Sequence, residues 1–126
     1  PFGSKARGKV LVVDDEDIIR RMISALLEKL GYEVETCVNG REAVEVYSER
    51  GSDFQLVIMD LAMPVMGGQE AFSAIKALNP RVRVLFCSGF SPDLDLQPLI
   101  TGPNIGFLGK PFRKLDLAIA IQKLLK

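Results

Sequence analysis

The sequence contains no histidine among its 126 residues. This absence excludes metal sites with imidazole ligands, Ser–His–Asp catalysis and acid–base chemistry by an imidazole. Lysine plus arginine equals aspartate plus glutamate, at 16 each, so the basic excess typical of a nucleic-acid-binding domain is missing. No apolar run approaches the length of a membrane-spanning helix, and no signal-peptide pattern is present. We therefore expect a domain that contacts neither nucleic acid nor membrane.

Cysteine is scarce, with Cys37 and Cys87 as the two examples. They end different predicted strands, and the topology expected below places two further strands between them. At about 4.8 Å per strand step, their separation far exceeds the Cα distance of about 7 Å that a disulfide allows. Free thiols are typical of a reducing compartment, so we expect this domain in the cytoplasm, whether or not its parent chain is attached to a membrane.

The chain has the size of one ordinary domain, and 48% of its residues are hydrophobic, enough for a real core. Residues 1–8 (PFGSKARG) are small and basic, and we expect a flexible linker there, followed by one domain at residues 9–126. The first residue is proline rather than methionine. We therefore expect a fragment of a longer or processed chain.

Short β-rich segments alternate with helical patterns along the chain. The expected strands are Lys9–Val13, Tyr32–Cys37, Gln55–Asp60, Arg83–Ser88 and Ile105–Gly109. Five alternations of strand and helix predict an α/β fold with a parallel sheet, right-handed crossovers and helices on both faces. The segment Tyr32–Cys37 alternates polar and apolar residues, which indicates a strand near the sheet edge. The last helix should start near Arg113, and Ser91–Asn104, with three prolines, predicts a short or irregular element.

Polar and charged side chains follow the ends of four predicted strands. These side chains, which we call the acidic edge, are Asp14, Asp15, Asp60, Ser88 and Lys110. In a parallel α/β sheet, sites lie at the carboxyl ends of the strands. The sequence thus predicts a site for a divalent metal and a phosphoryl group at this edge.

The three aspartates of the acidic edge require a counter-charge. Two carboxylates about 4 Å apart repel by roughly 4 kcal/mol at an effective dielectric near 20. Because neither histidine nor cysteine is available as a ligand, a hard ion such as Mg²⁺ fits best. We expect Asp15 and Asp60 to bind it directly and Asp14 to act through water. The alternative, that Asp14 and Asp15 only cap the following helix, is disfavoured by the matching residues at other strand ends.

Asp60 is the expected nucleophile, because a carboxylate attacks a phosphoryl group without needing a base and forms an acyl phosphate. Mg²⁺ and Lys110 would neutralise the charge, and Ser88 would donate a hydrogen bond to a phosphoryl oxygen. The alternatives are that Lys110 is a solvated surface lysine and that Ser88–Gly89 only marks a turn. The position of Lys110 between an apolar run and Pro111 argues against the first.

Four motifs, VVDDED, MDLAMPVMGG, CSG and GFLGKPF, follow one another in order from about Lys9 towards the C-terminus. Together they resemble the receiver domains of bacterial two-component response regulators. The resemblance implies a flavodoxin-like (βα)5 fold with a doubly wound five-stranded sheet in the order 2-1-3-4-5. It also implies that Asp60 accepts a phosphoryl group from phosphohistidine in a magnesium-dependent reaction, and that the domain then switches conformation.

The resemblance assigns further roles to individual residues. It gives the ligands of Mg²⁺, or of Mn²⁺ in its place, as Asp14, Asp15, Asp60 and the backbone carbonyl of Ala62. It makes Lys110 the lysine that contacts the phosphate and pairs Ser88 with Phe107 as the conformational switch. It also implies a cis peptide bond before Pro111.

The resemblance implies a histidine kinase or a histidine phosphotransfer domain as the partner. The expected docking surface beside the acidic edge consists of Ile18, Ile19, Pro111 and Phe112. Ile18 lies off the apolar stripe of the first helix, and Ile19 lies at its margin. The alternative is that Ile18 is simply an exposed apolar residue, which is common.

The motifs CSGF and GFLGKPF are most similar to receivers within hybrid sensor histidine kinases. The parent chain is then a kinase, whereas this domain catalyses only its own phosphorylation and dephosphorylation. The alternatives are a stand-alone single-domain response regulator and, less favoured, a phosphohydrolase of the haloacid-dehalogenase type. Such enzymes carry a second aspartate two positions after the nucleophile, where this sequence has Ala62. A flavin-binding electron carrier is disfavoured because DDED would repel the FMN phosphate.

Overall fold

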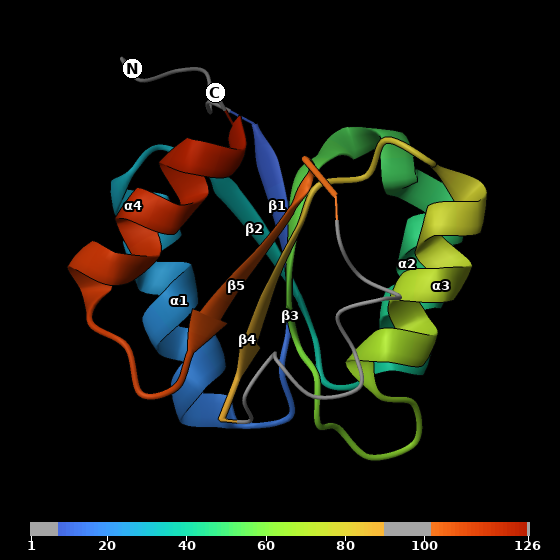
Figure 1. Cartoon of the computed structure of the whole chain (residues 1–126), viewed down its shortest axis with the longest axis horizontal. Helices are drawn as coiled ribbons and strands as arrows, with labels where there is room; N and C mark the ends of the chain where they lie inside the picture. Colours follow the sequence, from blue (N-terminus) through green and yellow to red (C-terminus); the bar gives the residue numbers. More distant parts are fainter. Residues whose placement is uncertain (1–7, 90–101, 126) are drawn as a thin grey trace.

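The computed structural model describes residues 8–89 and 102–125. Its elements are β1 (Lys9–Val13), α1 (Asp17–Lys29), β2 (Glu33–Cys37), α2 (Gly40–Arg50), the 3-10 helix η1 (Gly51–Asp53), β3 (Phe54–Asp60), α3 (Gly68–Leu78), β4 (Val84–Ser88), β5 (Ile105–Gly109) and α4 (Lys114–Leu125). The strands form one parallel sheet in the order β2-β1-β3-β4-β5 (Figure 1). The predicted α/β flavodoxin-like fold is confirmed.

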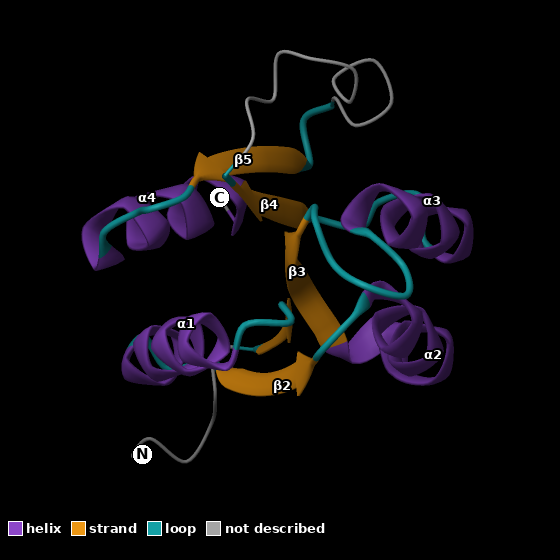
Figure 2. Ribbon diagram, turned by 90° about the horizontal axis from the view of Figure 1, so that it is seen from below, coloured by secondary structure: helices purple, strands orange, loops and turns teal. Residues whose placement is uncertain are grey.

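Helices cover both faces of the sheet, as the alternating sequence pattern predicted. α1 and α4 lie on one face, and α2 and α3 lie on the other (Figure 2). Successive residues of a strand point to opposite faces, so each central strand contributes to two cores. In β1, Val10 and Val12 pack in the α1/α4 core, whereas Leu11 and Val13 pack in the α2/α3 core. Burial on both faces explains why this strand is apolar without alternation.

Local sequence signals set the ends of the first two helices. α1 is followed by Gly31, whose φ of 99° lies in the left-handed region that glycine adopts without strain. Asn39 caps α2, because its side chain accepts a hydrogen bond from the backbone N–H of Glu42 at 2.9 Å. Gly31 therefore marks the end of α1 and Asn39 the start of α2, as the sequence pattern indicated.

The predicted strand limits agree with the observed ones to within one residue. β1 and β5 have the predicted limits, and β2 is an edge strand as its alternation indicated. The other three strands begin one residue away from the expected positions, at Glu33, Phe54 and Val84. Hydrogen-bonded pairing, rather than residue type alone, decides where a strand begins.

Some expectations concern residues outside the described ranges. The expected linker at residues 1–8 is described only at Gly8, and the expected irregular element at residues 91–104 is described only at its last three residues. The expectation of a helix between β4 and β5, which a (βα)5 fold implies, also lies outside the described residues. Within the described ranges, no helix combines the length and the hydropathy that crossing a membrane requires.

Candidate functional site

The acidic edge forms where the parallel strands end. Its members are Asp14 and Asp15 after β1, Asp60 in β3, Ser88 in β4 and Lys110 after β5. Val13 of β1 pairs with Met59 of β3, and Ser88 of β4 pairs with Gly109 of β5. This register brings the carboxyl ends of the strands level with one another. Residues up to 96 positions apart in the sequence therefore meet at one edge.

Three carboxylates converge at this edge, as the sequence predicted. One oxygen from each of Asp14, Asp15 and Asp60 lies within 4.8 Å of the other two. Asp14 and Asp60 are buried, at 1% and 6% exposed, whereas Asp15 is exposed. Anions this close repel one another, and more strongly where water is excluded. A cation close to these carboxylates therefore stabilises the cluster.

Asp14 is held by its backbone and by its side chain. Its N–H donates to the carbonyl of Cys37 at 3.1 Å, and its own carbonyl accepts a hydrogen bond from Arg20 Nη1 at 2.8 Å. Its Oδ1 accepts from the backbone N–H of Glu16 at 2.9 Å. With one oxygen engaged locally, Oδ2 faces Lys110 at 3.0 Å.

Lys110 supplies the nearest positive charge. Its Nζ lies 3.0 Å from Asp14 Oδ2, 3.2 Å from Asp60 Oδ2 and 3.2 Å from Glu16 Oε1. An ammonium has three N–H donors, so these contacts use all of them. Burial alone lowers the pKa of Lys110, but the hydrogen bonds and charges of Asp14 and Asp60 outweigh it and raise the pKa above its ordinary value. With a side chain only 16% exposed, Lys110 is not a solvated surface lysine.

The pKa of Asp60 is set mainly by burial, which outweighs the charge of Lys110. Burial raises its pKa, the charge of Lys110 lowers it and the charge of Asp14 raises it, with a net result above the ordinary value. The backbone N–H of Ala62 donates to its Oδ1 at the long distance of 3.4 Å. The Asp60 carboxylate is thus largely buried and held by long hydrogen bonds, which suits it to attack an electrophile.

The start of α3 supports the backbone of Asp60. The N–H of Gly68 donates to the carbonyl of Leu61 at 3.0 Å. A Cβ placed on Gly68 would lie 2.4 Å from the carbonyl oxygen of Asp60, so a side chain has no room here. Glycine at this position therefore allows the helix to pack directly against the strand end that carries Asp60.

The donor set fits a hard divalent cation. All three clustered groups are carboxylates, and oxygen ligands are what Mg²⁺ and Mn²⁺ prefer. The thiol of Cys87 is buried in the α1/α4 core, and burial raises its pKa to about 12. The choice of direct ligands among Asp14, Asp15 and Asp60, and the part of the Ala62 carbonyl, stay predictions.

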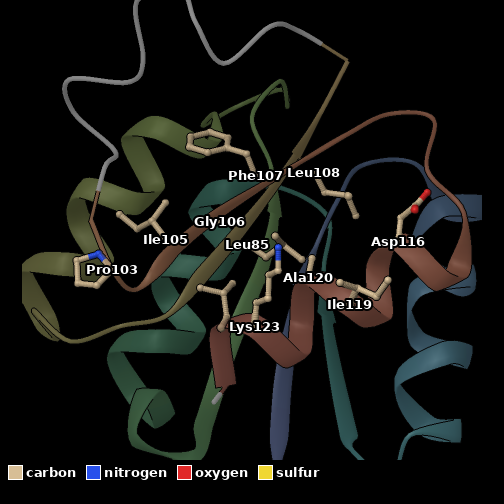
Figure 3. Close-up of a pocket in the computed structure, with 11 residues that line it drawn as sticks. Leu85, Pro103, Ile105, Gly106, Phe107, Leu108, Asp116, Ile119, Ala120 and Lys123 are labelled. Atoms are coloured by element: carbon tan, nitrogen blue, oxygen red, sulfur yellow. The ribbon is translucent and has the colours of Figure 1, made fainter.

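The two expected switch residues lie on neighbouring strands. Ser88 is buried at 5% exposed, and its carbonyl accepts the backbone N–H of Lys110 at 2.8 Å. Phe107 stacks on Phe86 with 5.6 Å between the ring centroids, in the α2/α3 core. Leu108 points to the opposite face of β5 (Figure 3). The switching role of Ser88 and Phe107 stays a prediction.

Figure 3 also shows an apolar groove between β5 and α4. Its walls include Leu85, Ile105, Ile119 and Leu124. No residue of the acidic edge lines this groove, so it is separate from the candidate site.

The four predicted docking residues differ in exposure. Ile18 is 80% exposed and Pro111 is exposed, whereas Ile19 and Phe112 are partly buried against the α1/α4 core. Ile18 and Ile19 belong to α1, which contacts α4, and Pro111 and Phe112 lie in the segment between β5 and α4. The peptide bond before Pro111 is cis, as expected. On α4, Leu115 is 65% exposed and was not predicted. The docking role of these residues stays a prediction.

Two residues that contact the site were missed from the sequence. Glu16 reaches Lys110 across 94 sequence positions, a contact that no local pattern reveals. Arg20 donates to the Asp14 carbonyl and, through Nη2, to Asp17 at 2.9 Å. A cation near a helix N-terminus opposes the helix dipole and requires a nearby anion or carbonyl, and this signal could have drawn attention to Arg20.

Comparison with known sequences agrees with this geometry. Residues 10–122 match the family described as the response regulator receiver domain. The chain therefore belongs to this family, whose members are components of two-component signalling systems. Receiver domains bind Mg²⁺ at an acidic pocket, and the described structure has its aspartate cluster at the carboxyl edge of the sheet.

Individual relatives place the chain more closely. It is 35% identical over 119 residues to the chemotaxis protein CheY of Thermotoga maritima, covering 94% of this chain and 98% of that protein. It is 32% identical over 117 residues to the sensor kinase CckA of Brucella abortus, covering 93% of this chain but only 12% of the kinase. A response regulator receiver domain from Clostridium thermocellum superposes with a TM-score of 0.83 at 33% identity, covering 94% of each chain.

Proposed function

We propose that this receiver domain accepts a phosphoryl group on Asp60 in a reaction that requires Mg²⁺ or Mn²⁺. The observation that carries the proposal is the arrangement around Asp60. Its buried carboxylate lies 3.2 Å from the Lys110 ammonium and shares an oxygen cluster with Asp14 and Asp15. The position supplies a nucleophile, a fixed positive charge and a place for a metal ion together.

The chemical step transfers the phosphoryl group from a P–N bond in the donor to a P–O bond on Asp60. An Asp60 Oδ forms a bond to phosphorus while the P–N bond of the donor phosphohistidine breaks, and the electron pair of that bond returns to the imidazole nitrogen. Lys110 neutralises the charge on the transferred group, and Ser88 donates its hydroxyl to a phosphoryl oxygen. Asp14, Asp15, Asp60 and the Ala62 carbonyl would hold the metal ion, which would supply further charge neutralisation. Attack by water on the acyl phosphate releases inorganic phosphate, so the domain catalyses only its own phosphorylation and dephosphorylation.

The signal leaves the site through Ser88 and Phe107 in this proposal. A phosphoryl group on Asp60 draws the Ser88 hydroxyl towards it, and Phe107 turns into the space that is vacated. Support comes from the packing of the Phe107 ring against Phe86, which lies two residues before Ser88 in β4. The event is a two-state change in packing that a local charge biases.

The partner in this proposal is a phosphorylated histidine kinase or a histidine phosphotransfer domain. Ile18, Ile19, Pro111 and Phe112 would form the docking surface, and the high exposure of Ile18 supports it. Ile18→Asp should slow transfer from a phosphorylated histidine kinase but not from acetyl phosphate. Leu78→Asp is the matched control, because Leu78 is also exposed, at 53%, but ends α3. Equal slowing by both donors would contradict the docking role of Ile18.

We further propose that the domain is part of a hybrid sensor histidine kinase, with a stand-alone response regulator as the alternative. The similarity to 12% of the CckA kinase supports the first, and the similarity over 98% of CheY supports the second. Cys37 and Cys87 are both free, which supports a reducing cytoplasm for the domain in either case.

The experiment that tests the acceptor role uses the purified chain, Mg²⁺ and acetyl phosphate, followed by intact mass spectrometry. Wild type should gain the mass of one phosphoryl group, and the gain should disappear when Mg²⁺ is chelated. Asp60→Asn should gain nothing, whereas Asp53→Asn, which changes an exposed aspartate of η1, should behave as wild type. An equal gain in Asp60→Asn would contradict the proposal.

A further inference from the structure

Glu16 occupies a position that its residue type does not favour. It is the N-cap of α1, where serine, threonine, aspartate and asparagine are preferred because their short side chains reach the free N–H groups. Among the described residues, the Glu16 side chain finds no such N–H partner in the helix. Its Oε1 instead lies 3.2 Å from Lys110 Nζ. Glu16 thus departs from the usual N-cap preference, and its side chain contacts the acidic edge instead.

The backbone of Glu16 is fixed, so the side chain starts from a defined point. Its N–H donates to Asp14 Oδ1 at 2.9 Å, and its carbonyl accepts the backbone N–H of Arg20 at 3.0 Å. The Glu16 side chain is 60% exposed, whereas those of Asp14 and Asp60 are 2% and 7% exposed. Glu16 therefore contacts Lys110 from the solvent side of the cluster.

This contact occupies a donor that a phosphoryl group needs. The three N–H donors of Lys110 face three carboxylates, so a phosphoryl oxygen near Asp60 must displace one of them. An exposed ion pair is weak, because water competes for both partners. Of the three carboxylates, that of Glu16 is the one Lys110 releases most easily.

We propose that Glu16 is a positioning residue that holds the outer donor of Lys110 and competes with the phosphoryl group for it. The inference rests on the proposed acceptor function of Asp60 and adds a control on that site. Glu16 raises the concentration of phosphodonor that is needed for half-maximal phosphorylation, because each productive encounter must first break the Glu16–Lys110 pair.

Three variants separate this contact from a general effect of charge. Glu16→Gln removes the charge. Glu16→Asp keeps the charge but shortens the side chain by one methylene group, which withdraws the carboxylate from Lys110 and turns it towards the free N–H groups of α1. Glu28→Gln is the matched control, because it removes the same charge from an exposed position near the other end of α1.

The first measurement is the phosphorylation rate as a function of acetyl phosphate concentration at saturating Mg²⁺. Glu16→Gln and Glu16→Asp should each lower the half-saturating concentration about two- to fivefold, the range expected for one exposed ion pair. The maximal rate should change less than the half-saturating concentration. Glu28→Gln should match wild type.

The second measurement reports the contact without any phosphodonor or metal. In protein labelled with ¹⁵N-lysine, the Lys110 ammonium protons should exchange with water faster in both Glu16 variants than in wild type or Glu28→Gln. Across wild type, the two Glu16 variants and Glu28→Gln, a faster exchange of the Lys110 protons must go with a lower half-saturating concentration of acetyl phosphate. A variant that speeds the exchange without lowering the half-saturating concentration, or the reverse, would overturn the inference. Absence of any phosphorylation in wild type would contradict the acceptor function instead, and the exchange data would still report the contact.

Discussion

The backbone N–H of Lys110 donates a hydrogen bond to the carbonyl oxygen of Ser88 at 2.8 Å. This bond joins the end of β4 to the residue after β5, so the residue that carries the hydroxyl and the residue that carries the ammonium have a fixed separation. From there the Lys110 side chain extends to Asp60 Oδ2 at 3.2 Å. The backbone positions of Ser88 and Lys110 are therefore set by the pairing of β4 with β5.

Arg20 should stabilise the loop that carries Asp14. Its side chain is 16% exposed and donates to the Asp14 carbonyl at 2.8 Å, whereas the neighbouring Arg21 is 80% exposed and contacts Asp17 from solvent. Arg20→Met should lower the free energy of unfolding by about 1–3 kcal/mol, and Arg21→Met by less than about 0.5 kcal/mol. Urea unfolding of both variants checks this prediction. Equal losses would contradict a specific role for Arg20.

Gly68 should be intolerant of a side chain. An added Cβ would lie 2.4 Å from the Asp60 carbonyl oxygen, so Gly68→Ala must displace the strand end or the helix. We expect a loss of about 1–3 kcal/mol in the free energy of unfolding and slower phosphorylation of Asp60. At Gly89, no described atom outside the neighbouring residues lies within 4 Å of an added Cβ, so Gly89→Ala should change stability by less than about 0.5 kcal/mol. A Gly68→Ala variant as stable and as active as wild type would refute the close packing.

Asp60 should reduce stability at neutral pH. Burial raises its pKa above the ordinary value of 3.8, so the folded state holds this proton more tightly than the unfolded state. The resulting stabilisation is present below the unfolded pKa and is lost as the pH rises through the folded pKa. The free energy of unfolding of Asp60→Asn should therefore exceed that of wild type by about 1 kcal/mol at pH 7. This difference in stability should shrink as the pH falls towards 4.

Thermal or urea unfolding over this pH range is the measurement for Asp60→Asn. Asp53→Asn serves as the control, because Asp53 is exposed and its substitution should give no comparable gain. Wild type more stable than Asp60→Asn at pH 7 would show that the pair with Lys110 outweighs the cost of burial.

Much of this architecture could be predicted from the sequence, for physical reasons. Apolar runs gave the limits of β1 and β5, and parallel strands must end at one edge, which brought Asp60 and Lys110 together. The contact of Glu16 with Lys110 could not be predicted, because it depends on the reach of a side chain across 94 positions. The close approach of Gly68 to Asp60 depends on the path of a loop, which has no periodicity to read.

Val65 illustrates the same limit and gives a further prediction. Its φ of 68° is positive, which is a strained conformation for a β-branched residue, and its side chain is 67% exposed. Val65→Asn should raise the free energy of unfolding by about 1 kcal/mol, because asparagine tolerates this conformation. Val38→Asn, at an exposed valine whose φ is negative, should give no gain when both are measured by urea unfolding. Equal effects at the two positions would indicate that Val65 carries no strain.

The most direct test of the central claim is to locate the phosphoryl group. After reaction with Mg²⁺ and acetyl phosphate, borohydride reduces an aspartyl phosphate to homoserine, which peptide mass spectrometry identifies by position. We predict homoserine at position 60 and unmodified aspartate at positions 14 and 15. Homoserine at position 14 or 15, or at none of the three, would contradict the assignment of Asp60 as the phosphoryl acceptor.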